Sequence, residues 1–335
     1  MKNDAAPLLR VRGLCKHFSV RSRGLVRRVT GWIRAVDDVS FDLARGETLG
    51  LVGESGSGKT TCARTILRAL TPTAGEAVFQ SSSGPVDLAS LPAHRLKPLR
   101  REMQKIFQDP FSSLNPRMTV GQIVAEPLVI HRLASGSTLE DRVADMMSRV
   151  GLDPAHRQRY PHAFSGGQRQ RIGIARALIL RPSFIVADEA VSALDVSVQA
   201  QIINLLRDLQ DELHLTSIFV AHDLGVVRYL CDRVAVMYAG RIVETGPTEA
   251  IFAEPRHPYT RALLAAAPST DPDIPLPPPV PGETCDPGNL PSGCAFHPRC
   301  PSCLEPCRTM RPSLEPLGGD HLVACHLHAP ISETI

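Results

Sequence analysis

The sequence predicts an α/β domain with a largely parallel sheet, followed by a small cysteine-rich C-terminal extension. Three observations support this prediction. Between Leu8 and about Ala266, short apolar strands alternate with amphipathic helices, a pattern typical of parallel sheets with crossover helices. A glycine-rich loop directly follows one of the apolar strands. Five of the nine cysteines lie between Cys294 and Cys325.

The strands and helices of the α/β domain are predicted from periodicity. Strands are predicted at 36–43, where polar residues interleave, and at 48–52, which is apolar enough to be buried. A helix is predicted over Val198–Leu213, because apolar residues recur at helical spacing, and a buried strand over Ser217–Val220 comes after it. Between about 110 and 164, helix-like segments such as Val143–Val150 alternate with turns. This stretch predicts a helical insertion in the sheet domain.

Composition restricts the class of protein. Of the 335 residues, 43% are hydrophobic, which is enough for a sizeable core and excludes a wholly disordered chain. The 37 basic residues exceed the 34 acidic ones by only 3, so charge does not indicate a nucleic-acid partner. The chain has no apolar run of 18 residues, and Met1–Arg12 lacks the apolar stretch of a signal peptide. We expect a globular protein that neither spans a membrane nor is exported.

The glycine-rich loop is the most specific motif in the chain. Residues 53–60 read Gly-Glu-Ser-Gly-Ser-Gly-Lys-Thr and lie between a predicted buried strand and a predicted helix. Glycines let the backbone wrap a phosphate closely, Lys59 supplies a positive charge near the β- and γ-phosphates, and the Thr60 hydroxyl is a Mg²⁺ ligand. A simple Gly/Ser turn is the alternative, and the eight-residue match in this context argues against it.

Two acids end another apolar strand, Phe184–Asp188. Asp188 is suited to hold Mg²⁺ through its water shell, and Glu189 is suited to polarise an attacking water. Two acids at a strand end usually mark only a solvated turn. Together with the phosphate loop they predict nucleotide hydrolysis.

Residues 164–171, Phe-Ser-Gly-Gly-Gln-Arg-Gln-Arg, resemble the signature of the ATP-binding cassette (ABC) ATPases. The spacing from phosphate loop to signature to strand acids also matches that family. Ser165 to Gly167 can open a helix whose N-terminal N–H groups face an anion. The resemblance implies that this anion is the γ-phosphate of an ATP held by another subunit. It therefore implies a dimer that buries two ATP molecules.

Other family positions occur in order along the chain. Gln108 resembles the Q-loop glutamine, Ser192–Asp195 the D-loop at the dimer interface, and His222 the switch histidine that contacts the γ-phosphate. The resemblance assigns catalysis to Glu189, His222 and Gln108. It implies Mg²⁺ ligation by Thr60, Gln108 and Asp188. It implies ATP contacts by Phe18, Gly53, Ser55, Gly56, Ser57, Gly58, Lys59, Thr60, Thr61, Gln108, Asp188, Ser165, Gly166, Gly167, Gln168 and Asp195.

Two features depart from the family pattern. The adenine-stacking aromatic normally lies shortly before the second strand; Phe18 is the candidate and Trp32 competes with it. A basic insertion, Arg21–Arg34, separates Phe18 from that strand and is predicted to be a solvated loop, with contact to membrane headgroups or a membrane subunit as the alternative.

Family members usually carry proline after the catalytic glutamate, and this chain has Ala190. Because proline there only stiffens a turn, we expect hydrolysis to persist.

Four further segments resemble the oligopeptide/dipeptide permease branch, and the early insertion resembles its F-type subunit. They lie at 107–116, 159–162, 192–197 and 257–261. This resemblance implies an ATPase at the cytoplasmic face of the membrane that drives peptide import. Its implied partners are a paralogous ATPase, two transmembrane subunits and a substrate-binding protein. Nickel import by the same branch, a soluble cassette ATPase in translation or repair, and an electron-transfer protein are the alternatives.

The C-terminal part is predicted to start with a linker, because seven prolines lie between Pro268 and Pro281. The segment beyond this linker is poor in apolar periodicity, so we expect it to need a metal for folding.

Four thiolates can enclose a [4Fe–4S] cluster or Zn²⁺, and the resemblance favours the cluster. Free thiols, or a ligating pair Cys303–Cys307, are the alternatives, and Cys285 is a spare. The predicted ligands are Cys294, Cys300, Cys307 and Cys325. The predicted units are 1–267, with a helical subdomain at about 109–165, and 268–335.

Overall fold

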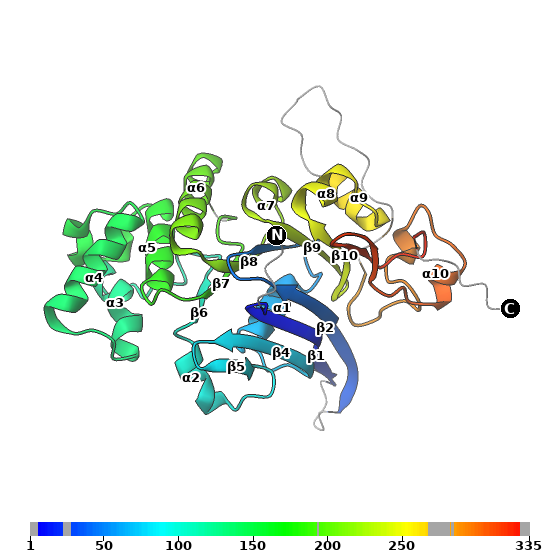
Figure 1. Cartoon of the computed structure of the whole chain (residues 1–335), viewed down its shortest axis with the longest axis horizontal. Helices are drawn as coiled ribbons and strands as arrows, with labels where there is room; N and C mark the ends of the chain where they lie inside the picture. Colours follow the sequence, from blue (N-terminus) through cyan, green and yellow to red (C-terminus); the bar gives the residue numbers. More distant parts are fainter. Residues whose placement is uncertain (1–5, 23–27, 193, 267–281, 283–284, 329–335) are drawn as a thin grey trace.

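The computed structural model describes residues 6–22, 28–192, 194–266, 282 and 285–328. Two sheets form its centre (Figure 1). The smaller sheet is antiparallel, in the order β2 (Val29–Leu43), β1 (Leu9–Arg21), β4 (Ala74–Ser81) and β5 (Gly84–Asp87). The larger sheet has the order β11 (Glu315–Gly318), β12 (His321–Val323), β10 (Arg241–Pro247), β9 (Arg233–Tyr238), β3 (Thr48–Val52), β8 (Thr216–Val220), β7 (Phe184–Asp188) and β6 (Met103–Ile106).

The five strands β9, β3, β8, β7 and β6 are parallel to one another. All five residues of β3 are buried, as the predicted strand at 48–52 requires. In a parallel sheet the carboxyl ends of the strands share one edge, and loops at that edge carry the ligand site. The loops after β3, β7 and β8 therefore bring Lys59, Glu189 and His222 to the same edge.

The helices surround this sheet. Helix α6 begins two residues before the predicted helix 198–213, and it buries Ile202, Ile203 and Leu209 against the core. The helices are α1 (Lys59–Ile66), α2 (Leu96–Leu99), α3 (Val120–Ile130), α4 (Gly136–Arg149), α5 (Gly166–Leu178), α6 (Val196–Leu213), α7 (Leu224–Leu230), α8 (Thr248–Ala253), α9 (Pro258–Ala265) and α10 (Pro306–Thr309), with 3₁₀ turns at Ala93–Arg95, Pro154–Gln158, Pro161–Ala163 and His297–Arg299. Within the described ranges, no helix combines the length and apolar character that a membrane span needs.

A helical insertion lies between β6 and β7 and forms one end of the molecule (Figure 1). Thr119 caps α3 with a hydrogen bond to the Gln122 N–H, and the Gln122 side chain returns a bond to the Thr119 N–H. Helix α4 buries Val143, Met146 and Met147. The predicted insertion at 109–165 contains α3 and α4, and α5 begins directly after it.

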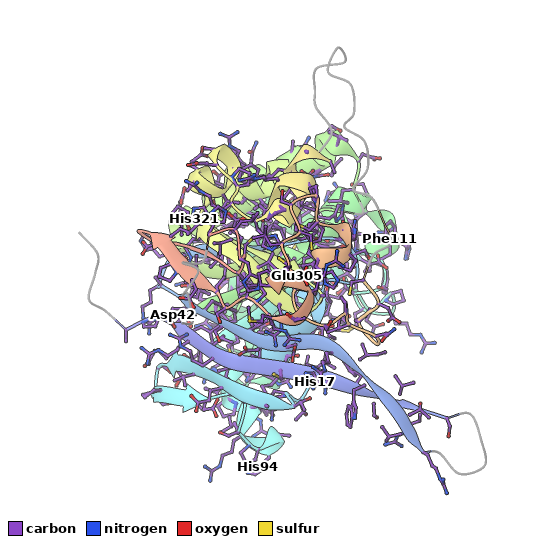
Figure 2. All side chains as sticks on the ribbon, turned by 90° about the vertical axis from the view of Figure 1, so that its right-hand side faces the viewer. His17, Asp42, His94, Phe111, Glu305 and His321 are labelled. Atoms are coloured by element: carbon purple, nitrogen blue, oxygen red, sulfur yellow. The ribbon has the colours of Figure 1, made fainter. Side chains whose placement is uncertain are left out.

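The prediction of a solvated loop at Arg21–Arg34 is wrong. Strand β1 continues to Arg21 and β2 begins at Val29, so residue 21 and residues 29–34 of the insertion are strand in an antiparallel hairpin, while 23–27 lie outside the described residues. Figure 2 shows this hairpin projecting from the body beyond His17. The β-branched and aromatic residues between the arginines favour a strand, while the guanidinium groups stay in water at its surface.

The C-terminal extension, here residues 285–328, joins the larger sheet. Glu244 of β10 pairs with Val323 of β12, and the His321 imidazole lies 2.8 Å from the Glu244 carboxylate. Backbone pairing and burial of Val323 thus stabilise a segment that was predicted to depend on a metal. The prolines of the predicted linker, 268–281, lie outside the described residues.

Candidate functional site

The phosphate loop has a backbone that only glycine adopts at two of its positions. Gly53 has φ +148° and Gly58 has φ +104°. A Cβ at Gly53 would lie 2.2 Å from the Met237 carbonyl oxygen, and one at Gly58 would lie 2.1 Å from the Ala35 carbonyl oxygen. The glycines therefore allow the loop to pack against β9 and β2, as well as to turn.

Lys59 lies inside the loop. Its Nζ donates hydrogen bonds to the carbonyls of Gly53 (2.7 Å) and Glu54 (2.8 Å), and the side chain is buried. Burial lowers the pKa of Lys59, while the charges of Glu189 and Asp188 act in the opposite direction. The ammonium is thus held at the position from which the loop contacts a phosphate.

Asp188 joins the predicted Mg²⁺ ligands. Its carboxylate accepts a hydrogen bond from the Thr60 hydroxyl at 2.9 Å, and it lies 2.7 Å from the Lys105 Nζ. Arg64, Lys105, Gln108 and Asp188 line a cavity of about 470 Å³. This cavity combines hard oxygen ligands with cationic side chains, which suits a metal-bound phosphate.

Glu189 is hydrogen-bonded to Gln108 and lies near His222, the two other predicted catalytic residues. Gln108 donates a 2.6 Å hydrogen bond to its carboxylate, and the His222 Nδ1 lies 3.9 Å from the same oxygen. The Glu189 backbone is left-handed, with φ +49°, which is unusual for a side chain of this size. Its N–H bonds the Val220 carbonyl of β8, and the Ser192 hydroxyl bonds its carbonyl. These backbone bonds hold the strained turn in place, and the bond from Gln108 orients the Glu189 carboxylate.

Two polar residues of this site were missed in the sequence. Lys105 supplies the cation beside Asp188, and Gln170, buried at 2% exposure, donates a 2.6 Å bond to the Ala190 carbonyl. Gln170 thereby supports the turn at the position where Ala190 replaces the family's proline. Neither residue lies next to Asp188 or Glu189 in the sequence. The only indication of Gln170 in the sequence is its position inside the signature segment 164–171.

The signature opens a helix, as predicted. Ser165 caps α5 by accepting a bond from the Gln168 N–H, and the Gln168 side chain accepts one from the Ser165 N–H. A Cβ at Gly167 would lie 2.3 Å from Val198 Cγ1, so this glycine permits close contact of α5 with α6. Asp195 is the N-cap residue of α6, and Ala193 of the predicted D-loop lies outside the described residues.

The other predicted ATP contacts lie at the loop tip, in α1 and on the hairpin. Ser55 and Gly56 are exposed at the loop tip, and Thr61 lies in the first turn of α1. Phe18 pairs with Ile33, and Ser19 pairs with Trp32, so Phe18 and Trp32 point to opposite faces of the hairpin. Only one of the two aromatics can face a nucleotide bound at the loop.

The structure brings the four predicted cysteine ligands into one neighbourhood. Burial, then the nearby thiols of Cys307, Cys325 and Cys300, raise the pKa of Cys294 to about 11. The Cys294 N–H also bonds the Cys307 carbonyl at 2.8 Å. For Cys285 the charges that act on the pKa are not thiols: burial and then the Asp286 carboxylate raise its pKa, and Arg299 lowers it. The extension therefore gathers the four thiol groups, with Cys303 also near Cys300.

Comparison with known proteins agrees with this geometry. A family model described as "ABC transporter" matches residues 36–192. A second model, described as "Oligopeptide/dipeptide transporter, C-terminal region", matches residues 243–307. The first range contains the phosphate loop, the signature and Glu189, and the second contains α9 and three of the four cysteines.

Similar proteins cover nearly the whole chain. A putative peptide import ATP-binding protein of Brucella ovis is 52% identical over 320 residues, spanning 95% of this chain and 97% of the relative. The oligopeptide transport ATP-binding protein AppF of Bacillus subtilis is 47% identical over 326 residues, spanning 96% and 98%. The dimeric ATP-binding cassette MJ0796, solved with ADP and phosphate after hydrolysis, has TM-score 0.61 and 28% identity over 72% of this chain and 98% of that one. With this site and these relatives, the chain belongs to the ABC transporter family and is one of its cassette ATPases.

Proposed function

We propose that this chain is the ATP-hydrolysing subunit of a membrane importer for di- and oligopeptides. The observation that carries the proposal is the single edge of the larger sheet where Lys59, Asp188, Glu189 and His222 meet. The similarity of the whole chain to peptide import ATP-binding proteins supports the substrate class.

The residues at this edge of the sheet have three roles: phosphate binding, Mg²⁺ binding and proton transfer. Lys59 exchanges its two carbonyl partners for phosphate oxygens when ATP binds. Thr60, Asp188 and Gln108 would hold Mg²⁺, which would neutralise phosphate charge. Glu189, oriented by Gln108 and by its strained turn, accepts the proton of the attacking water.

The proposed active unit is a dimer. Helix α5 and helix α1 lie apart in one chain (Figure 1), which supports delivery of the Ser165 segment by a second subunit. In a sandwich of this kind Ser165, Gly166, Gly167, Gln168 and Asp195 contact the ATP of the partner. We propose a heterodimer with a paralogous ATPase, bound to two transmembrane subunits at the cytoplasmic face of the membrane, with a substrate-binding protein delivering the peptide.

Affinity purification in mild detergent tests this function. The tagged full chain is expressed in its native host, and co-purifying proteins are identified by mass spectrometry. Peptide-stimulated phosphate release is then measured in proteoliposomes, with the Lys59→Ala protein as the matched control. Transmembrane subunits and peptide stimulation that requires Lys59 are expected. Recovery of ribosomes or repair factors without membrane subunits would refute the importer.

We further propose that Cys294, Cys300, Cys307 and Cys325 bind a [4Fe–4S] cluster. Proximity supports this proposal: the Cys294 N–H bonds the Cys307 carbonyl, and burial followed by the neighbouring thiols raises the pKa of Cys294 and of Cys325. Thiolates also neutralise the positive charge of iron. Anaerobic purification followed by iron and acid-labile sulfide assays tests the cluster. Iron and sulfide near four per chain, with broad absorbance near about 400 nm, are expected. A colourless protein containing zinc would overturn it.

A further inference from the structure

One ion pair joins the C-terminal extension directly to the phosphate loop. Arg299 ends the 3₁₀ turn His297–Arg299, and its guanidinium donates two parallel hydrogen bonds to the Glu54 carboxylate, at 2.9 and 3.1 Å. Only 7% of the Arg299 side chain is exposed, against 29% for Glu54. A bidentate pair shielded from water is stronger and more directional than a surface ion pair. The two residues are 245 positions apart in sequence.

Glu54 is part of the machinery that holds Lys59. Its carbonyl accepts a bond from the Lys59 Nζ at 2.8 Å, so its peptide orients the ammonium. Its N–H donates to the Tyr259 hydroxyl at 2.7 Å. Glu54 is therefore fixed on three sides: by Lys59 inside the loop, by Tyr259 of α9, and by Arg299 of the extension. The Glu54 carboxylate and the Glu54 peptide that contacts Lys59 thus belong to one residue that the extension also contacts.

The turn that carries Arg299 is itself held in place by packing and by backbone hydrogen bonds. Phe296, in the same turn, is 1% exposed and packs on Tyr238 and Tyr259, with ring centroids 5.3 and 5.4 Å away. The Arg299 guanidinium carbon lies 5.8 Å from the Phe296 ring centroid. Backbone bonds tie the turn to Cys294 on one side and Cys300 on the other. A rigid turn of this kind delivers the guanidinium at low entropic cost.

We propose that Arg299 is a positioning residue for ATP binding, which acts through Glu54 on the Lys59 loop. This inference rests on the proposed ATPase function. The extension thereby supplies a part of the nucleotide site that the loop sequence does not contain. Because the contact is with the loop and not with the hydrolytic carboxylate, its loss weakens ATP binding and leaves the chemical step largely intact.

The test uses the full chain with three changes: Glu54→Gln, Arg299→Gln and the double substitution. Glu54→Gln leaves the extension untouched and removes the charge from the loop side. Each single change is expected to raise KM and Kd for ATP about tenfold, with kcat within about twofold. The double substitution is expected to match the single ones, because all three remove one interaction. Arg299→Lys, which keeps the charge but loses the fork, is expected to recover part of the affinity.

Arg308→Gln is the matched control, since Arg308 is an exposed arginine of the same extension. Thermal unfolding and iron content are measured on every variant to separate positioning from anchoring. Unchanged ATP affinity in both single variants, whatever their unfolding temperature, would overturn the inference alone. So would losses that multiply in the double variant. A wild-type protein that binds no ATP would overturn the proposed function, and the inference with it.

Discussion

The phosphate loop and the C-terminal extension are built by opposite strategies. The loop consists of eight contiguous residues. Its glycine conformations and the position of Lys59 depend on residues within this short segment. The extension assembles from residues spread over 285–328, and its sheet contact is a short pairing of β12 with β10. Local sequence therefore specifies the loop, while the extension takes its structure from the elements against which it packs.

The two regions nevertheless meet at Glu54. Tyr259 and Arg299, both inside the range matched by the C-terminal family model, contact this residue of the loop. A motif that is contiguous in sequence is thus supported in space by residues more than 200 positions away along the chain. The nucleotide site therefore extends beyond its signature sequences.

The largest expected effect concerns Glu189, which follows β7 at the same edge of the sheet as the phosphate loop. Glu189→Gln removes the general base while keeping the shape of the side chain. Phosphate release should fall about 1000-fold, with ATP binding retained, because general-base catalysis contributes about 100- to 10,000-fold. Single-turnover kinetics with labelled ATP measures both quantities. Unchanged turnover would remove Glu189 from catalysis and with it our account of the strained turn.

On the extension side, Cys294→Ser should abolish iron binding and lower the unfolding midpoint by about 5 °C or more, since metal binding contributes folding free energy. Cys285→Ser is the matched control, because both thiols are half-buried and only Cys294 lies among the other thiols. Iron assay and calorimetry are performed on both proteins. Equal iron loss in the two would contradict the proposed ligand set.

A pH experiment examines the junction between the regions. Burial, with a smaller contribution from His328, lowers the pKa of His257 to about 3. Below about pH 6.5 the unfolded chain binds the proton first, so this stability is full above pH 6.5 and is lost as pH falls toward 3. From pH 7 to pH 5 the free energy of unfolding should fall by about 2 kcal/mol from this group.

His257→Asn is the matched variant, because asparagine keeps the cap of α9 without titrating in this range. Urea unfolding at pH 7 and pH 5 measures the difference. The variant should lose less stability than the wild type over this interval. An identical loss in both proteins would mean that His257 is protonated in the folded state.

The smallest effect separates the two aromatics of the hairpin. If Phe18 stacks on adenine, Phe18→Ala should weaken ATP binding about threefold to tenfold, as loss of one aromatic contact does. Trp32→Ala, on the opposite face, is the control and should change affinity less than twofold. Fluorescent-nucleotide titration decides between them. The reverse order would assign adenine to Trp32.

Much of the site could be predicted from sequence because its residues end strands. The strand at 48–52 is confirmed to the residue, and β8 and α6 begin within two residues of their predicted starts. Parallel strands then bring their ends together without further information. The Arg21–Arg34 hairpin was missed because charge was taken to indicate a loop, although strand edges tolerate arginine in water. Lys105 and Gln170 were missed because their roles depend on partners 83 and 20 residues away.

By itself the sequence determined the phosphate loop, the signature helix and the buried strands that carry the site, since each depends on backbone conformations and spacings encoded within a few residues. Only the tertiary structure decided that β12 joins the main sheet, that Gln170 supports the turn after Glu189, and that Arg299 reaches Glu54. The physical reason is distance along the chain. A contact between remote residues depends on how the whole core packs, and no local pattern of residue types records it.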